Sequence, residues 1–495
     1  ATINSVTVGK GANSVSGNTV LGETALDASV SGADNTAIGK NALTTLTSGA
    51  RNTALGKDSA QLSTTGNDNV AIGSAALSAN TSGSNNIGIG RTSLLSNTTA
   101  SNNTAVGYGS LLSNTTGAAN TALGYRALLS NTTAANNTAV GGDALSSNTT
   151  GTQNVSVGQG SLENSTTSNN NTAVGYDALN ANTTGTANVG IGKHALLVST
   201  TGDFNTAVGT DCLDAGTTGD NNTAVGDRAL SANTTASNNT ALGGQALFAN
   251  TTGTKNVAVG AYSLDANTTA NDNTALGYGA LTANTTGSSN TAVGGESVLG
   301  VNTTGNRNTG VGYQSLTSNT TANDNTAMGY NTLVLNTTGV DNNAFGSSSL
   351  DANTTGSSNC AFGFASLSAN TTASNNTAIG HQALLANTTG TRNTAVGSNA
   401  LDANTTANDN AAFGNNSLSA NTTGVDNNGF GGNTLLVNTT GRSNCAFGFQ
   451  SLTANTTADN NTAFGHQTLL ANTTGAQNVA VGANALDANT TGSLN

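Results

Sequence analysis

The sequence predicts an all-β fold, a parallel β-solenoid of about 29 coils, from three observations. The phrase Asn-Thr-Ala-Val-Gly, or a close variant, returns with a constant 17-residue period from Gly22 to Gly294 and again from Gly312 to Gly482. Apolar, small and polar residues keep fixed positions within that period. The chain contains no proline, which would remove a donor from any central strand. A short fixed period is typical of a solenoid, in which each coil buries its apolar residues against its neighbours.

We therefore expect one continuous repeat region over residues 1–495. Its first coil is short, covering 9–22, and a one-residue insertion lies near residue 300. Positions within a coil are numbered from its anchor glycine, so that Val106 is at −1 of Gly107. Length alone would suggest about three domains, but nothing interrupts the repeat for long enough to mark a boundary.

Two short strands are predicted in each coil, at −4 to 0 and at +2 to +6. Position −1 is always apolar and −3 is usually Thr, so these two positions are expected to face the core together. Position +4 is Leu in nearly every coil and is expected to join that core. Turns are predicted at the anchor and through the Asn-Thr-Thr-Gly phrase. The anchors and leucines chosen as structural positions are Gly107, Gly124, Gly141, Leu111, Leu128 and Leu145.

Positions −2 and +3 hold only small residues, such as Ala105 and Ser110. A face confined to small residues indicates that another backbone approaches closely. That backbone is either the opposite wall of a very thin coil or a second chain.

Asparagine forms two columns, one at −4 and one at +7. Stacked coils would align the amides, each donating to its neighbour's carbonyl, as in Asn ladders of cross-β stacks. The ladder residues chosen at −4 are Asn103, Asn120, Asn137 and Asn154. At +7, Asn114, Asn131 and Asn148 also open Asn-Thr-Thr triplets that match the N-glycosylation acceptor, so glycosylation is the alternative interpretation there.

Composition argues against several functions. Only 7% of residues are charged and the net charge is −12 without any basic run, which excludes a nucleic-acid footprint. No apolar stretch approaches the length of a membrane span. The histidines His194, His381 and His466 fall at variable positions away from any Cys or carboxylate cluster. We therefore expect no metal, no cofactor and no enzymatic activity.

Three cysteines are expected to be free thiols within one chain. Cys360 and Cys445 share position −3 five coils apart, roughly 24 Å at about 4.8 Å per strand, beyond disulfide reach. The favoured interpretation is a small buried residue in place of Thr. The alternative is a contact with the same residue of another chain.

The phrase Asn103-Thr-Ala-Val-Gly107, and more closely Asn4-Ser-Val-Thr-Val-Gly9, resembles the head repeat of the trimeric autotransporter adhesins, the YadA-like family. Similar longer repeats occur in phage or algal-virus tail-fibre-like proteins. The resemblance implies a left-handed parallel β-roll with three chains side by side on an extracellular fibre used for attachment. The present coil is longer than that family's, and no coiled-coil stalk or membrane anchor is visible in the sequence.

The predicted function is a structural segment, shaft or head, of an extracellular fibre or adhesin on a cell or virion surface. Its expected partners are further copies of itself, as a trimer, and a host-surface or matrix receptor that contacts the variable positions. The alternatives are a non-adhesive surface filament and an ice-binding solenoid. Ice binding is disfavoured because Val, Ile, Asn and Cys interrupt the Thr column at −3, which points to burial of that column.

Overall fold

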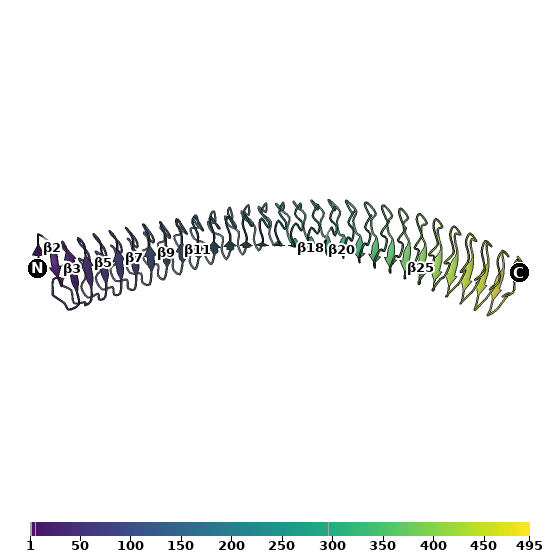
Figure 1. Ribbon diagram of the computed structural model, residues 1–495, viewed down its shortest axis with the longest axis horizontal. Helices are drawn as coiled ribbons and strands as arrows, with labels where there is room; N and C mark the ends of the chain where they lie inside the picture. The colour runs from purple at the N-terminus through teal and green to yellow at the C-terminus, as the bar shows by residue number, and fades with distance from the viewer. Residues whose placement is uncertain (1, 5, 296) are drawn as a thin grey trace. The chain divides into compact units, whose positions relative to one another are not determined.

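The computed structural model describes residues 2–4, 6–295 and 297–495, and these residues form strands and turns without any helix. Two compact units, Ala1–Thr252 and Gly253–Asn495, are present, and each is a stack of parallel coils. Figure 1 shows one strand arrow in each coil, with the remainder of the coil drawn as a loop. The predicted all-β parallel solenoid with a 17-residue period is thus confirmed, whereas a single region over 1–495 stays a prediction.

The strands of the first unit are β1 (Thr2–Ile3), β2 (Val6–Gly9), β3 (Thr19–Gly22), β4 (Thr36–Ile38), β5 (Thr53–Leu55), β6 (Val70–Ile72), β7 (Ile87–Ile89), β8 (Thr104–Val106), β9 (Thr121–Leu123), β10 (Thr138–Val140), β11 (Val155–Val157), β12 (Thr172–Val174), β13 (Val189–Ile191), β14 (Thr206–Val208), β15 (Thr223–Val225) and β16 (Thr240–Leu242). The strands of the second unit are β17 (Val257–Val259), β18 (Thr274–Leu276), β19 (Thr291–Val293), β20 (Thr309–Val311), β21 (Thr326–Met328), β22 (Asn343–Phe345), β23 (Cys360–Phe362), β24 (Thr377–Ile379), β25 (Thr394–Val396), β26 (Ala411–Phe413), β27 (Asn428–Phe430), β28 (Cys445–Phe447), β29 (Thr462–Phe464) and β30 (Val479–Val481).

Parallel pairing begins at β3, where Thr19 pairs with Thr36, and each later strand within a unit pairs with the equivalent residues of the next coil. The short first coil expected over 9–22 is not formed. Instead β2 runs antiparallel to β3, with Val8 opposite Leu21. An antiparallel strand at this place covers the open edge of the first parallel strand, which would otherwise present unpaired donors and acceptors.

The predicted orientation of the strand side chains is wrong. In β8, the small residue Ala105 is fully buried, whereas Thr104 and Val106 on either side of it are only half-buried. The same alternation holds in every strand from β4 to β30. Positions −3 and −1 therefore form an outer sheet face, and the small residue at −2 packs inward because the coil is too thin to admit two large residues.

The second predicted strand, at +2 to +6, is also not formed. Positions +2 and +4 adopt left-handed backbone conformations, as at Arg126 with φ 56° and Leu128 with φ 51°. The N–H groups at +4 and +6 instead donate to the following coil, from Leu111 to Ala127 O at 3.0 Å and from Ser113 to Leu129 O at 3.0 Å. The segment is thus a column of hydrogen-bonded turns that satisfies the buried backbone without a β-ladder.

Leucine at +4 is the largest core residue, and its conformation is costly. A left-handed non-glycine residue costs about 1–3 kcal/mol, and Leu111 has φ 48° while being fully buried. Burying a leucine side chain contributes about 1.5–3 kcal/mol, so the two terms are of similar size. The neighbouring coil supplies much of that burial, because Leu486, in the last coil of the second unit, is 39% exposed whereas Leu469 before it is 0% exposed.

Candidate functional sites on the coils

The asparagine column at −4 joins successive coils through the backbone. The Asn120 N–H donates to Asn103 Oδ1 at 2.9 Å, and the Asn120 side chain donates from Nδ2 to Ala134 O at 2.8 Å. Asn137 repeats both contacts one coil further on. Asn154 adds a direct amide contact, from its Nδ2 to Asn137 Oδ1 at 3.2 Å. All four residues are completely buried, so each carboxamide is held on both sides by protein.

The column at +7 is a continuous amide ladder over Asn97, Asn114, Asn131 and Asn148. Each Nδ2 donates to the preceding Oδ1 at 2.9 Å. The same Nδ2 also donates to a carbonyl three residues ahead, as from Asn114 to Gly117 O at 2.9 Å. Both amide hydrogens are used and the side chains have no exposure, so a glycan on Asn114, Asn131 or Asn148 could be placed only on a coil that has opened.

The ladder at +7 breaks where the asparagine is replaced. Ser165 follows Asn148 and Ser199 follows Asn182 in the column, and in both cases the preceding Oδ1 is buried without a hydrogen-bond partner. Ser165 pairs instead with Ser168, which stands where other coils carry Gly or Ala. A buried acceptor left without a donor costs about 1–3 kcal/mol.

Restoring the repeat at this break is expected to stabilise the first unit. The double change Ser165→Asn with Ser168→Gly recreates Asn-Thr-Thr-Gly and gives Asn148 Oδ1 a donor. We expect a gain of about 1–2 kcal/mol in the free energy of unfolding. Ser168→Gly alone is the control, because it removes the partner of Ser165 without supplying an amide. Denaturant unfolding followed by circular dichroism measures the difference, and equal stability of the double variant and wild type would contradict the expectation.

The anchor glycines are fixed by close contact between coils. Gly107 has φ 134°, and a Cβ added there would lie 2.3 Å from Gly124 O. Gly124 and Gly141 have φ values of 140° and 138° with the same crowding against the next anchor. Leu111, Leu128 and Leu145 fill the interior beside them and have no exposure. These positions therefore maintain the stacking and offer no surface to a ligand.

The outer sheet face carries an exposed apolar column at −1. Leu55, Leu123 and Leu242 are 43%, 38% and 46% exposed. In the second unit the column includes stacked rings, with Phe413 and Phe430 centroids 4.7 Å apart and Phe430 and Phe447 centroids 4.5 Å apart. The Thr column at −3 shares this face and is not buried, so the expected burial of that column is wrong. The bulky rings nevertheless make the face uneven.

The charged residues and the histidines lie on the turns. Arg51, Arg307 and Arg392 each make a bidentate pair with the aspartate at the same position of the next coil, and the guanidinium hydrogen bond lowers the pKa of Asp68, Asp324 and Asp409. His194 lies 3.0 Å from Asp211 Oδ1, whereas His381 and His466 stack on Phe364 and Phe449. Among the described residues, no group of three or more His, Cys, Asp or Glu is placed to hold a metal ion.

The three cysteines occupy two environments. Cys212 is fully buried, and desolvation raises the pKa of its thiol to about 12. Its Sγ donates to Ala224 O at 3.2 Å. Cys360 and Cys445 lie half-buried on the outer sheet face, where partial burial also raises their pKa. The expectation that these two replace Thr inside the core is therefore wrong, because position −3 faces outward.

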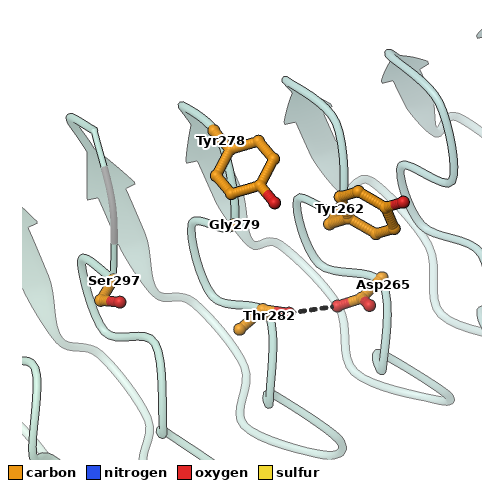
Figure 2. Close-up of a pocket in the computed structure, with 6 residues that line it drawn as sticks. All are labelled: Tyr262, Asp265, Tyr278, Gly279, Thr282 and Ser297. Atoms are coloured by element: carbon orange, nitrogen blue, oxygen red, sulfur yellow. Dashed lines mark hydrogen bonds between the residues drawn. The ribbon is translucent and has the colours of Figure 1, made fainter.

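A pocket of about 450 Å³ lies in the second unit, on the side of the turns. Figure 2 shows its lining: Tyr262, Asp265, Tyr278, Gly279, Thr282 and Ser297. The Tyr262 and Tyr278 rings stand 5.8 Å apart at 79°, above a hydrogen bond of 2.6 Å from Thr282 Oγ1 to Asp265 Oδ1. Its lining residues are not among those that the sequence predicts to be functional.

No family model matches the sequence, and no curated protein matches it. Within the part of the chain that the structure describes, no helix has the length and apolar character needed to cross a bilayer.

Proposed function

We propose that this chain is a structural segment, shaft or head, of an extracellular fibre or adhesin. The observation that carries the proposal is the repeated bonding between coils. Each coil is tied to the next through its strand, as from Thr104 N to Asn120 O at 2.9 Å, through its turn column, and through both asparagine columns. A stack that is hydrogen-bonded at four places in each coil resists local opening and proteolysis. An exposed fibre needs this resistance.

Identical chains are proposed to pack side by side through the outer sheet face. Position −1 is apolar in every coil and remains one-third or more exposed at Leu55, Leu123, Leu242 and many equivalents. A long, regular apolar strip of this kind on a soluble protein marks an interaction surface. Three chains and a left-handed coil are what the resemblance to the adhesin heads implies. The small residues at −2, considered above for this contact, are instead inside the coil.

Attachment is proposed to involve the variable positions +1, +2, +5 and the turns, which carry the tyrosines and the charges. Exposed side chains there, such as Tyr125 at 53% and Phe204 at 61%, could contact a host surface or matrix receptor. A non-adhesive filament would have the same coils and the same lateral packing. Selective binding of the purified fibre to a host surface separates the two functions, and uniformly absent binding favours the filament.

The double variant Leu123→Asp with Leu242→Asp tests lateral packing. Two carboxylates on the outer sheet face should convert the wild-type oligomer into monomer in analytical ultracentrifugation, because burying unpaired charges is costly. Circular dichroism should remain that of the wild type, since both side chains are exposed. The matched control is Thr116→Asp with Thr235→Asp, at exposed position +9 on the turns. A wild-type chain that stays monomeric at every concentration would contradict lateral packing.

A further inference from the structure

The pocket in the second unit lies where the repeat is broken. The coil that begins at Gly294 has one extra residue. Thr291 pairs with Thr309, which lies one residue beyond the partner that the 17-residue period predicts. The extra residue precedes Val298. The Leu281 N–H donates to Val298 O, one residue further along the chain than in the preceding coil, where Leu264 donates to Ala280 O. Ser297, with φ 66°, lies in this altered segment and lines the pocket.

The floor of the pocket is open because Gly279 has no side chain. An added Cβ at Gly279 would meet no atom within 4 Å, although φ is 62°. The equivalent glycine at another coil, Gly160, is different, because an added Cβ would lie 2.2 Å from the Asp177 carboxylate. The described residues of the neighbouring coil thus leave the space above Gly279 unfilled.

The two tyrosine rings of the pocket meet edge to face and do not stack. Elsewhere, tyrosines at +1 of successive coils stack nearly parallel, at 13° for Tyr108 and Tyr125 and 10° for Tyr313 and Tyr330. Tyr262 is at +2 and Tyr278 is at +1 of the next coil, and the rings meet at 79°. The crossed arrangement keeps ring surface open to the pocket, and the side chains are 40% and 59% exposed.

The polar groups of the pocket are one carboxylate and several hydroxyls. Thr282 fixes the orientation of Asp265 by donating to Oδ1, and no hydrogen bond to Oδ2 is found within the described part of the chain. The Ser297 and tyrosine hydroxyls can both donate and accept. The described residues that line the pocket include no lysine or arginine, so the Asp265 carboxylate would repel an anion.

We propose that this pocket binds a neutral saccharide unit. The C–H groups on one face of a pyranose ring pack against an aromatic ring, and Tyr278 with Tyr262 supplies two such surfaces. Adjacent sugar hydroxyls donate to the free oxygen of Asp265 and exchange hydrogen bonds with the hydroxyls around it. A volume of about 450 Å³ is within the range of small-molecule sites. The inference rests on the proposed function, because a sugar bound in this pocket would be one target to which the fibre attaches.

A saccharide fits better than an organic cation, the other ligand that tyrosines and a carboxylate recognise. A cation would interact only with the carboxylate and the ring faces. The site is open, so water and salt weaken the ionic and the cation–π attraction. A polyol also uses the hydroxyls of Ser297 and Thr282. The two ligand classes give different results in the experiment below.

The test is titration calorimetry of the full chain with methyl glycosides of glucose, galactose, mannose and N-acetylglucosamine and their disaccharides. We expect one of these neutral sugars to bind at one site per chain, with a dissociation constant on the order of 1 mM. Tyr278→Ala and Asp265→Asn should each weaken binding about tenfold or more, whereas Tyr330→Ala, at the same position of a stacked pair, should not change it. Gly279→Asn should also abolish binding, because asparagine tolerates the backbone but fills the floor.

Three outcomes would overturn the inference: binding of no sugar in the panel, binding of tetramethylammonium in place of sugar, or equal loss in Tyr330→Ala and Tyr278→Ala. The side chains changed are exposed or half-buried, and unchanged circular dichroism verifies folding of each variant. Absence of sugar binding would not affect the proposal of lateral packing, which ultracentrifugation tests separately. Failure of lateral packing, in turn, leaves the sugar titration interpretable on the monomer.

Discussion

Replacing Gly141 with alanine is expected to destabilise the first unit by about 3–5 kcal/mol. Gly141 has φ 138°, which alanine rarely adopts, and its new Cβ would lie 2.5 Å from Gly158 O and 2.6 Å from Gly158 C. The neighbouring coil cannot retreat without breaking the strand hydrogen bonds on both sides. Denaturant unfolding measures the loss, and hydrogen exchange should show reduced protection around β10 and β11.

Gly142→Ala is the matched control for this prediction. It adds the same methyl group one residue later, where no atom lies within 4 Å of the new Cβ. Its effect should stay within about 0.5 kcal/mol of wild type. Similar effects of the two substitutions would mean that the close approach of anchor glycines does not determine the stacking.

Replacing Asn131 with leucine is expected to cost about 2–4 kcal/mol. The change removes three hydrogen bonds: Nδ2 to Asn114 Oδ1 at 2.9 Å, Nδ2 to Ala134 O at 3.0 Å, and Asn148 Nδ2 to Asn131 Oδ1 at 2.9 Å. It leaves the Asn114 carbonyl buried without that donor. Thermal and denaturant unfolding of the purified variant measure the cost.

Asn182→Leu provides a comparison at the same position with the same burial. Asn182 keeps a hydrogen bond of 3.0 Å to Gly185 O, but its Oδ1 already has no partner because Ser199 replaces the next asparagine. We expect Asn182→Leu to cost at least about 1 kcal/mol less than Asn131→Leu. Equal costs would show that side-chain volume, and not the amide ladder, accounts for the asparagines at +7.

The period of the fold could be predicted, because the spacing of Gly107, Gly124 and Gly141 fixes the length of one coil. The direction of the strand side chains could not. Alternation places Val106 and Ala105 on opposite faces, and hydrophobicity alone favours the larger apolar residue for the core. The range of residue sizes at a position is a more informative signal than its hydrophobicity. Position −1 varies in size from Val to Phe, as a surface position can. Position −2 holds only Ala, Gly or Ser from β4 onward, as a tight interior requires.

The turn column was missed for a different reason. Leucine at +4, between alternating residues at +2 and +6, is typical of a strand, and leucine seldom adopts positive φ. The available signal was at +2 and −5, where glycine, asparagine and aspartate recur, as at Gly109, Asp143 and Asn102. These residues favour the left-handed conformation that the structure has there. The pocket depends on a combination of Tyr262, Gly279 and the insertion, which becomes visible only when successive coils are placed side by side.

Cryo-electron microscopy of the purified protein can show whether each 17-residue unit is one coil hydrogen-bonded onto the next. We expect a rise of about 4.8 Å per coil, with one short strand in each and the side chains at −1 on the outside. A map with helices, with a rise far from this strand spacing, or with the valines at −1 enclosed and the alanines at −2 exposed would contradict it.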